Sequence, residues 1–140
     1  MVRMPIQSLT SRHHCVYSIK YHLVLVTKYR KRCLTKPMLD MIAALARERA
    51  QAWDGAIIEV NGEADHVHFL VDLPPHHAVS EFVNALKTNT SRLLRRDFRA
   101  DLDRFYRSPV LWSRSYCVIS VGGAPLDVLK AYIQQQDAPI

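Results

Sequence analysis

The spacing of apolar residues changes several times along this chain, and the order of these changes restricts the fold more than any other feature. Apolar residues recur either with the two-residue period of strands or with the 3.6-residue period of helices. Strands are predicted at residues 17–26, 56–60, 65–73 and 110–121, and amphipathic helices at residues 37–53, 78–98 and 126–136. The order β-α-β-β-α-β-α is that of a split βαβ unit followed by one more helix. We therefore expect an α+β, ferredoxin-like fold: an antiparallel sheet with helices on one face and an additional C-terminal helix.

Single residues mark the ends of these elements. Pro37 suits the first turn of a helix, and Ser80 is a candidate N-cap of the next one. Asn61 and Gly62 form a strong turn signal, which predicts a hairpin between the two middle strands with a loop slightly longer than two residues. Gly122 and Gly123 precede the last helix and predict a flexible joint there.

Length and cysteine usage indicate the class of protein. A chain of 140 residues predicts one domain, residues 1–140, with residues 1–13 as a loose N-terminal segment. No apolar run reaches the length of a membrane span and no signal peptide is visible, so we expect no membrane association. Cys15, Cys33 and Cys117 form no CxxC pair, which favours reduced thiols and a cytoplasmic location.

The charge balance favours a polyanionic partner. Nineteen Lys and Arg face thirteen Asp and Glu, which gives a net charge of +6 and a pI near 9.5. Nucleic acid is the most plausible partner of such a chain, although a cluster of basic residues is often only a solvated face. The candidates for phosphate contacts form two clusters: Lys28, Arg30, Lys31 and Arg32, and Arg92, Arg95 and Arg96.

A pair of histidines lies in the third predicted strand. Residues i and i+2 of a strand share a face, so His66 and His68 present two imidazoles together, opposite Val67, Phe69 and Val71. Two imidazoles with oxygen ligands could hold a divalent cation, and Mg²⁺ or Mn²⁺ suits phosphate chemistry. The alternative is a solvated strand face, since seven histidines would give such a pair by chance in about a third of shuffled chains.

A tyrosine and a glutamine are spaced by four residues in the last predicted helix. Tyr132 and Gln136 therefore share a helix face, with a phenol beside an amide oxygen; Gln134 and Gln135 lack this spacing. A free phenol has a pKa near 10, so ionising it at pH 7 costs about 4 kcal/mol, which a nearby cation or base must offset. Packing in the core is the more common role of such a tyrosine.

No nucleotide cofactor is expected. The chain lacks a glycine-rich phosphate loop with its lysine, so any breakage and rejoining of nucleic acid would have no ATP to draw on. A covalent phosphotyrosine would avoid this difficulty, because the energy of the broken bond is retained in the intermediate.

Taken together, these motifs resemble the insertion-sequence 200/605 transposases, the single-tyrosine members of the HUH nuclease superfamily. The resemblance spans residues 14–136 and rests on five segments: 21–30, 65–70, 112–116, 120–123 and 132–136. It implies that His66, His68 and Gln136 are the metal ligands, with Mg²⁺ or Mn²⁺ as the cofactor. It also implies that Tyr132, on a C-terminal catalytic helix, attacks single-stranded DNA to form a 5′-phosphotyrosine and release a 3′-hydroxyl.

The resemblance further implies a homodimer that recognises hairpins at the ends of a mobile element. In such a dimer the tyrosine helix can complete the histidine site of the other protomer, and the Gly122–Gly123 joint would act as its hinge.

Three alternatives remain open at this point. A replication initiator or relaxase of the HUH type would share the tyrosine and the histidine pair. A non-catalytic RNA-binding module of the same fold would need exposed aromatic residues on the two central strands, where the histidine strand offers only Phe69, on the opposite face. A two-histidine RNA phosphoesterase would resemble a family with Ser or Thr two residues after each histidine, and neither His66 nor His68 has one.

Overall fold

A four-stranded antiparallel sheet forms the centre of the molecule. The computed structural model describes residues 10–12, 15–17, 19–121 and 126–135. The sheet has the order β4-β5-β3-β6, and its strands are β3 (Lys20–Thr27), β4 (Ala56–Gly62), β5 (His66–Asp72) and β6 (Trp112–Ser120). All three neighbouring pairs are antiparallel, with β5 inserted between β4 and β3. The predicted split βαβ order and ferredoxin-like α+β fold are therefore confirmed.

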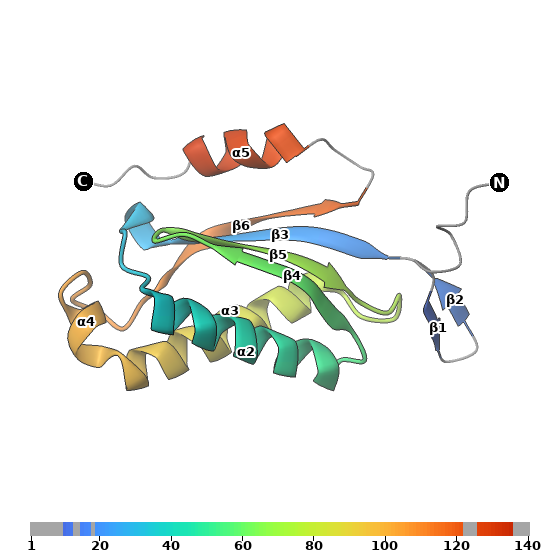
Figure 1. Cartoon of the computed structure of the whole chain (residues 1–140), viewed down its shortest axis with the longest axis horizontal. Coiled ribbons are helices and arrows are strands. Elements are labelled where there is room, and N and C mark those ends of the chain that lie inside the picture. The colour runs from blue at the N-terminus through green and yellow to red at the C-terminus, as the bar shows by residue number, and fades with distance from the viewer. Residues whose placement is uncertain (1–9, 13–14, 18, 122–125, 136–140) are drawn as a thin grey trace.

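Helices cover both faces of this sheet, as Figure 1 shows. The two long helices, α2 (Lys36–Ala52) and α3 (Val79–Asp97), lie together on one face, and the short α4 (Arg99–Asp103) follows α3 at its end. The last helix, α5 (Leu126–Gln135), lies alone on the opposite face. The predicted layering is thus confirmed. Every helix within the described residues is too short or too polar to cross a lipid bilayer.

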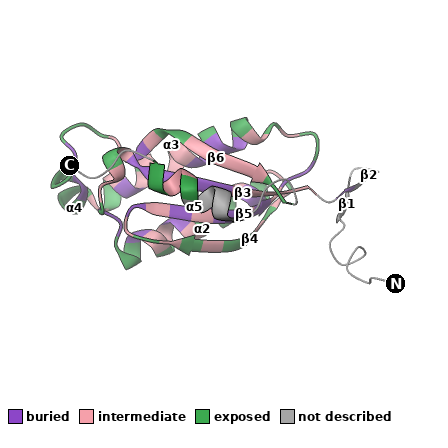
Figure 2. Ribbon diagram, turned by 90° about the horizontal axis from the view of Figure 1, so that it is seen from above, coloured by how far each residue is buried: buried purple, intermediate pink, exposed green. Residues whose placement is uncertain are grey.

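The hydrophobic core lies between the sheet and the pair α2 and α3. Residues of β5 alternate strictly, and Val67, Phe69 and Val71 are buried on the core side. Leu23 and Leu25 of β3 join them, since the register pairs Leu23 with Phe69 and Leu25 with Val67. Burying a Phe or Leu side chain contributes about 1.5–3 kcal/mol each, so this layer fixes the register and with it the opposite face of the sheet. The buried positions appear in purple in Figure 2.

Two short strands, one turn of 3₁₀ helix and the short helix α4 were not predicted. Strands β1 (Thr10–Arg12) and β2 (Cys15–Tyr17) pair as a separate two-stranded sheet at one end of the molecule (Figure 1). The described part of the N-terminal segment 1–13 is strand β1 itself. A 3₁₀ turn, η1 (Lys28–Arg30), follows β3 directly. Segments of three residues are too short to produce a recognisable hydrophobic period.

The predicted hairpin with a loop slightly longer than two residues is confirmed, but Asn61 and Gly62 do not form its turn. Asn61 pairs with His68 and Gly62 with Val67, so both residues belong to β4, and the chain reverses between Gly62 and His66. The glycine serves packing instead: a Cβ at Gly62 would lie 2.5 Å from Cδ2 of Leu39 on α2. A turn-forming dipeptide can therefore lie inside a strand where a helix has to approach closely.

The predicted cap of the second long helix is wrong, whereas its extent agrees with the prediction to within one residue at each end. The residue before α3 is Ala78, which makes no side-chain cap, and Ser80 lies inside the helix. The predicted helix 78–98 ends at Asp97, because Phe98 leaves the helical conformation (φ −123°, ψ 36°) before α4 begins.

Candidate active site

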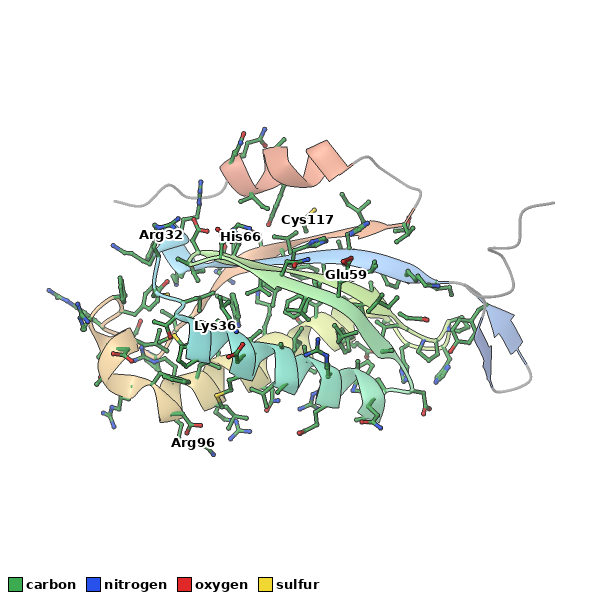
Figure 3. The ribbon with its side chains drawn as sticks, in the orientation of Figure 1. Arg32, Lys36, Glu59, His66, Arg96 and Cys117 are labelled. Atoms are coloured by element: carbon green, nitrogen blue, oxygen red, sulfur yellow. The ribbon has the colours of Figure 1, made fainter. Side chains whose placement is uncertain are left out.

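The histidine pair lies on the face of the sheet opposite the core. His66 and His68 are half-buried and alternate with the buried valines and Phe69 of β5. Antiparallel pairing places Val26 beside His66 and Val24 beside His68 on the same face. This is the face that α5 covers, and Figure 3 shows His66 on that side of the sheet. The predicted direction of the two imidazoles is therefore confirmed, whereas their role as ligands stays a prediction.

His66 is held by a buried carboxylate. Its Nδ1 lies 2.9 Å from Oδ1 of Asp65, which is only 2% exposed. The other carboxylate oxygen of Asp65 accepts a hydrogen bond from Nε of Arg30 at 3.2 Å. Burial alone would raise the pKa of Asp65, but the hydrogen bonds from His66 and Arg30 outweigh burial and hold that pKa below its ordinary value. Asp65 is thus a fixed negative charge behind the imidazole.

His68 contacts a third histidine. Its Nε2 lies 2.9 Å from Nδ1 of His22 on β3, and the two rings are stacked with centroids 5.0 Å apart. Burial lowers the pKa of His68, His22 lowers it further, and Glu59 opposes this only in part. The neutral ring, which is the form that binds metals, is therefore favoured.

Tyr132 reaches the same face of the sheet from α5. It packs with Ile133 over the buried Val24 and Val26, and its hydroxyl donates a hydrogen bond to Oγ of Ser115 on β6 at 3.4 Å. Burial raises the pKa of Tyr132, and the contact with Ser115 offsets this only in part. Figure 2 shows α5 lying across the sheet above β3. Strand β3 lies between β5, which carries the histidine pair, and β6.

Several predicted site residues lie outside the described part of the chain. These are the third ligand Gln136 and the hinge residues Gly122 and Gly123. Within the described ranges, no group of three or more His, Cys, Asp or Glu side chains is placed to hold a metal ion. Two imidazoles on one face still fit a divalent cation, provided that an oxygen donor such as the Gln136 amide joins them.

The basic residues fall into two separate groups. Arg30 and Arg32 lie near Asp65, at the end of β3, with the rest of the predicted cluster Lys28–Arg32. The second group lines a cavity of about 690 Å³ at the far end of α3, away from α5 (Arg96 in Figure 3). We call this cavity the arginine cavity; its cationic residues are Arg92, Arg95, Arg96, Arg99 and Arg107. Arg99 and Arg107 were not among the predicted DNA contacts, and only the fold brings Arg107 to the others.

Two further residues at the site escaped sequence reasoning. For Asp65, the only signal in the sequence was its position directly before the histidine pair. The sequence did not reveal that the Asp65 side chain is buried. His22 lies in the predicted strand 17–26, and only the register of β3 against β5 brings it into contact with His68, a predicted ligand.

Solved structures with this fold define the class of protein. A crystal structure of a chain assigned as a transposase from Deinococcus radiodurans matches with a TM-score of 0.82 and 29% identity, over 92% of this chain and 98% of that one. A REP-associated tyrosine transposase, solved with a bound REP hairpin, matches with a TM-score of 0.56 and 10% identity. The match covers 89% of this chain and 67% of that one, and it shows a shared fold. The fold is that of the tyrosine transposases.

Sequence comparison identifies the family within this class. Residues 15–136 match the family of IS200-like transposases, and the chain belongs to that family. The transposase of insertion sequence IS200 from Salmonella typhimurium is 33% identical over 109 residues, which cover 78% of this chain and 71% of the relative. The ISDra2 transposase TnpA of Deinococcus radiodurans is 28% identical over 135 residues, covering 96% and 95%.

Proposed function

We propose that this transposase cleaves and rejoins single-stranded DNA at the ends of a mobile element, with Tyr132 as the nucleophile and a divalent cation at His66 and His68. One observation carries the proposal most strongly: the phenol and the two imidazoles, about 65 residues apart in sequence, share the face of the sheet that lies away from the core helices. A shared face is what an attack by the phenol on a phosphate bound at the histidines would require.

The residues of this face suit a metal-dependent phosphate reaction. Nδ1 of His66 is occupied by Asp65, and Nε2 has no hydrogen-bond partner among the described residues, so it is available as a ligand. His68 and the amide oxygen of Gln136 would complete the protein ligands. When bound, Mg²⁺ or Mn²⁺ would polarise the scissile phosphate and stabilise the charge on the leaving oxygen.

Tyr132 would form the covalent link. Its oxygen bonds to phosphorus, the bond from phosphorus to O3′ breaks, and the proton lost by the phenol is balanced by the one gained at the 3′-hydroxyl. A phenol is neutral at pH 7 even with its ordinary pKa, and burial raises the pKa of Tyr132 further, so a nearby cation or base has to favour its ionisation. The reverse attack by a different 3′-hydroxyl would rejoin the DNA without a nucleotide cofactor.

Hairpins at the element ends are the proposed DNA partner. A structural neighbour is described as bound to a REP hairpin, and the arginine cavity here gathers five guanidinium groups on one surface. Arg99 is 81% exposed, and Arg95 is 13% exposed with its Nη1 unpartnered among the described residues. Guanidinium groups bind phosphates in bidentate geometry, so this cavity suits a DNA backbone.

A homodimer and a moving tyrosine helix are part of the same proposal. Among the described side chains of α5, Tyr132 and Ile133 pack on its own sheet over Val24 and Val26. Such a contact could be exchanged for an equivalent one on a partner protomer. The hinge at Gly122 and Gly123 stays a prediction.

A replication initiator or relaxase of the HUH type is the remaining alternative in chemistry, and joining of two separate element ends would distinguish transposition from it. The RNA-binding alternative loses support, because Phe69 is fully buried in the core and the positions of β3 and β5 on the other face carry no Phe, Tyr or Trp. These positions hold histidine, aliphatic and charged residues: Lys20, His22, Val24, Val26, His66, His68, Leu70 and Asp72.

The deciding experiment uses a panel of single-stranded oligonucleotides with hairpins, incubated with the protein and Mg²⁺. We expect a protein–DNA adduct that survives a denaturing gel and disappears with a chelator. Cleavage without any adduct would contradict the tyrosine mechanism, and an adduct formed in the chelator would contradict the metal.

A further inference from the structure

Asp65 is the most deeply buried charged residue among the described side chains, and the proposed reaction does not use it directly. It is 2% exposed, and it lies between β4 and β5, directly before His66. A buried carboxylate requires partners, since an unpaired one would be strongly destabilising. Its partners therefore indicate what it does.

The first partner determines the state of the His66 ring. Oδ1 of Asp65 lies 2.9 Å from Nδ1 of His66. An ionised carboxylate can only accept a hydrogen bond, so Nδ1 must carry the proton. The lone pair of the neutral ring then lies on Nε2, the nitrogen that faces away from Asp65. Imidazoles that bind metals commonly owe their tautomer to such a carboxylate.

The second partner holds the carboxylate itself. Nε of Arg30 donates to Oδ2 of Asp65 at 3.2 Å, and the Arg30 side chain is 23% exposed. Arg32 also approaches Oδ2, but at 3.8 Å and with a side chain that is 64% exposed. The pair with Arg30 is shielded from water, whereas the pair with Arg32 is an ordinary surface contact.

The backbone near Arg30 is shaped for this contact. Tyr29 and Arg30 have φ values of 59° and 52°, in the left-handed region that residues other than glycine rarely adopt. Several hydrogen bonds hold the surrounding turn. The hydroxyl of Thr27 donates to the carbonyl of Lys31 at 2.7 Å, and the amide of Thr27 donates to the carbonyl of Asp65 at 3.0 Å. Unfavourable backbone conformations persist where neighbouring contacts impose them, and they cluster at functional sites.

We propose that Asp65, held by Arg30, is a positioning residue that fixes His66 with its proton on Nδ1 and so presents Nε2 to the cation. This inference rests on the proposed metal-dependent function. It also assigns Arg30, predicted from sequence as a DNA contact, to the metal site instead.

The substitution Asp65→Asn tests this proposal sharply. An amide offers one acceptor and one donor where the carboxylate had two acceptors. If its oxygen stays with Arg30, its N–H donates to Nδ1 of His66, and the imidazole proton moves to Nε2, where it blocks a metal. Exchanging a carboxylate for an amide behind a histidine is known to reverse a tautomer in this way.

The readout is the tautomer in the metal-free protein, from long-range ¹H–¹⁵N NMR of the imidazoles at neutral pH, with His66→Gln to assign the His66 signals. We expect the Nδ1–H form in the natural protein and the Nε2–H form in Asp65→Asn. An Nε2–H form in the natural protein would overturn the proposal even if the variant failed to fold. The same tautomer in both proteins would also overturn it.

Affinity for Mn²⁺, measured by electron paramagnetic resonance of the free ion, is the second readout. We expect a loss of about 10–100-fold in Asp65→Asn. Arg30→Gln should weaken the affinity for Mn²⁺ measurably. Its matched control, Arg32→Gln, should leave that affinity within about twofold of the natural protein. Equal effects of the two would count against the special role of Arg30.

These measurements separate the two proposals. The tautomer is read without metal and without DNA. If cleavage proves to be independent of metal while His66 keeps its proton on Nδ1, the proposed function fails and the arrangement of Asp65 stands. If metal-dependent cleavage is found with the other tautomer, only the role of Asp65 fails.

Discussion

The hydroxyl of Tyr132 lies 3.4 Å from Oγ of Ser115, so the last helix rests on strand β6 of its own chain. A hydrogen bond of this length is weak. Tyr132 also belongs to an apolar cluster with Val24, Val26, Cys117, Ile119 and Ile133. Among the described residues, its hydroxyl has only this weak hydrogen bond to exchange for an incoming phosphate, which suits a resting state.

Removing the phenol oxygen should abolish covalent chemistry alone. In Tyr132→Phe we expect no protein–DNA adduct and hairpin affinity within about twofold of the natural protein, since the arginine cavity is untouched. Denaturing gels and fluorescence anisotropy measure the two. Tyr21→Phe, on the core side of β3, is the control and should retain the adduct. Full cleavage by Tyr132→Phe would remove Tyr132 from its role.

Loss of either histidine of the pair should abolish metal-dependent cleavage. We expect His66→Ala and His68→Ala to reduce the cleavage rate more than about 100-fold, since even partners behind metal ligands cost 10–100-fold. Excess chelator should have the same effect on the natural protein. His76→Ala, an exposed histidine in the loop after β5, serves as the control. Unchanged activity in the chelator would contradict the metal site.

Substitutions in the arginine cavity should weaken hairpin binding in a manner that depends on salt. We expect Arg99→Ala and Arg107→Ala each to lower the affinity for the hairpin. Each should also reduce the steepness of the slope of log affinity against log salt concentration by about 0.7–0.9. Arg47→Ala, an exposed arginine of α2 outside the cavity, should leave both quantities unchanged. Equal losses in all three variants would indicate that only the net charge matters.

A buried hydrogen bond between α3 and β6 should contribute to stability. Oγ1 of Thr90 accepts a hydrogen bond from Nε1 of the buried Trp112 at 2.8 Å. Thr90→Val keeps the shape but leaves the indole N–H unpaired, so we expect the free energy of unfolding to fall by about 1–3 kcal/mol. Chemical denaturation measures this, with the exposed Thr88→Val on the same helix as the control. Equal effects of the two would show that the hydrogen bond is unimportant.

The ionisation of Tyr132 should report whether α5 is docked on the sheet. Burial raises the pKa of Tyr132 above its ordinary value of about 10. The folded protein therefore favours the neutral phenol, and the stabilisation that this provides is present below pH 10 and is lost as pH rises through the raised pKa. Ultraviolet difference titration of the natural protein against Tyr132→Phe should show a phenolate forming above pH 10. An ordinary pKa would indicate an undocked helix.

Local periodicity explains why so much of the fold could be predicted. The strict alternation in β5 predicted which side of the strand His66 and His68 occupy, because the buried Val67, Phe69 and Val71 leave them only the other face. Where one residue type serves two purposes, the prediction failed: Gly62 indicated a turn, but it allows Leu39 of α2 to approach β4. A glycine in the sequence does not reveal whether it is needed for its backbone or for its missing side chain.

The sequence by itself determined the order of the long elements and the outward face of the histidine strand, because both depend on the spacing of residues close together in the chain. It also determined the family, because the motifs occur in a specific order along the chain. Tertiary structure alone decided that His22 contacts His68 across 46 residues, that Arg30 reaches Asp65 across 35, and that α5 lies over β3. These contacts depend on the register between strands and on a left-handed turn after β3, and both are selected by packing of the whole core rather than by any local pattern.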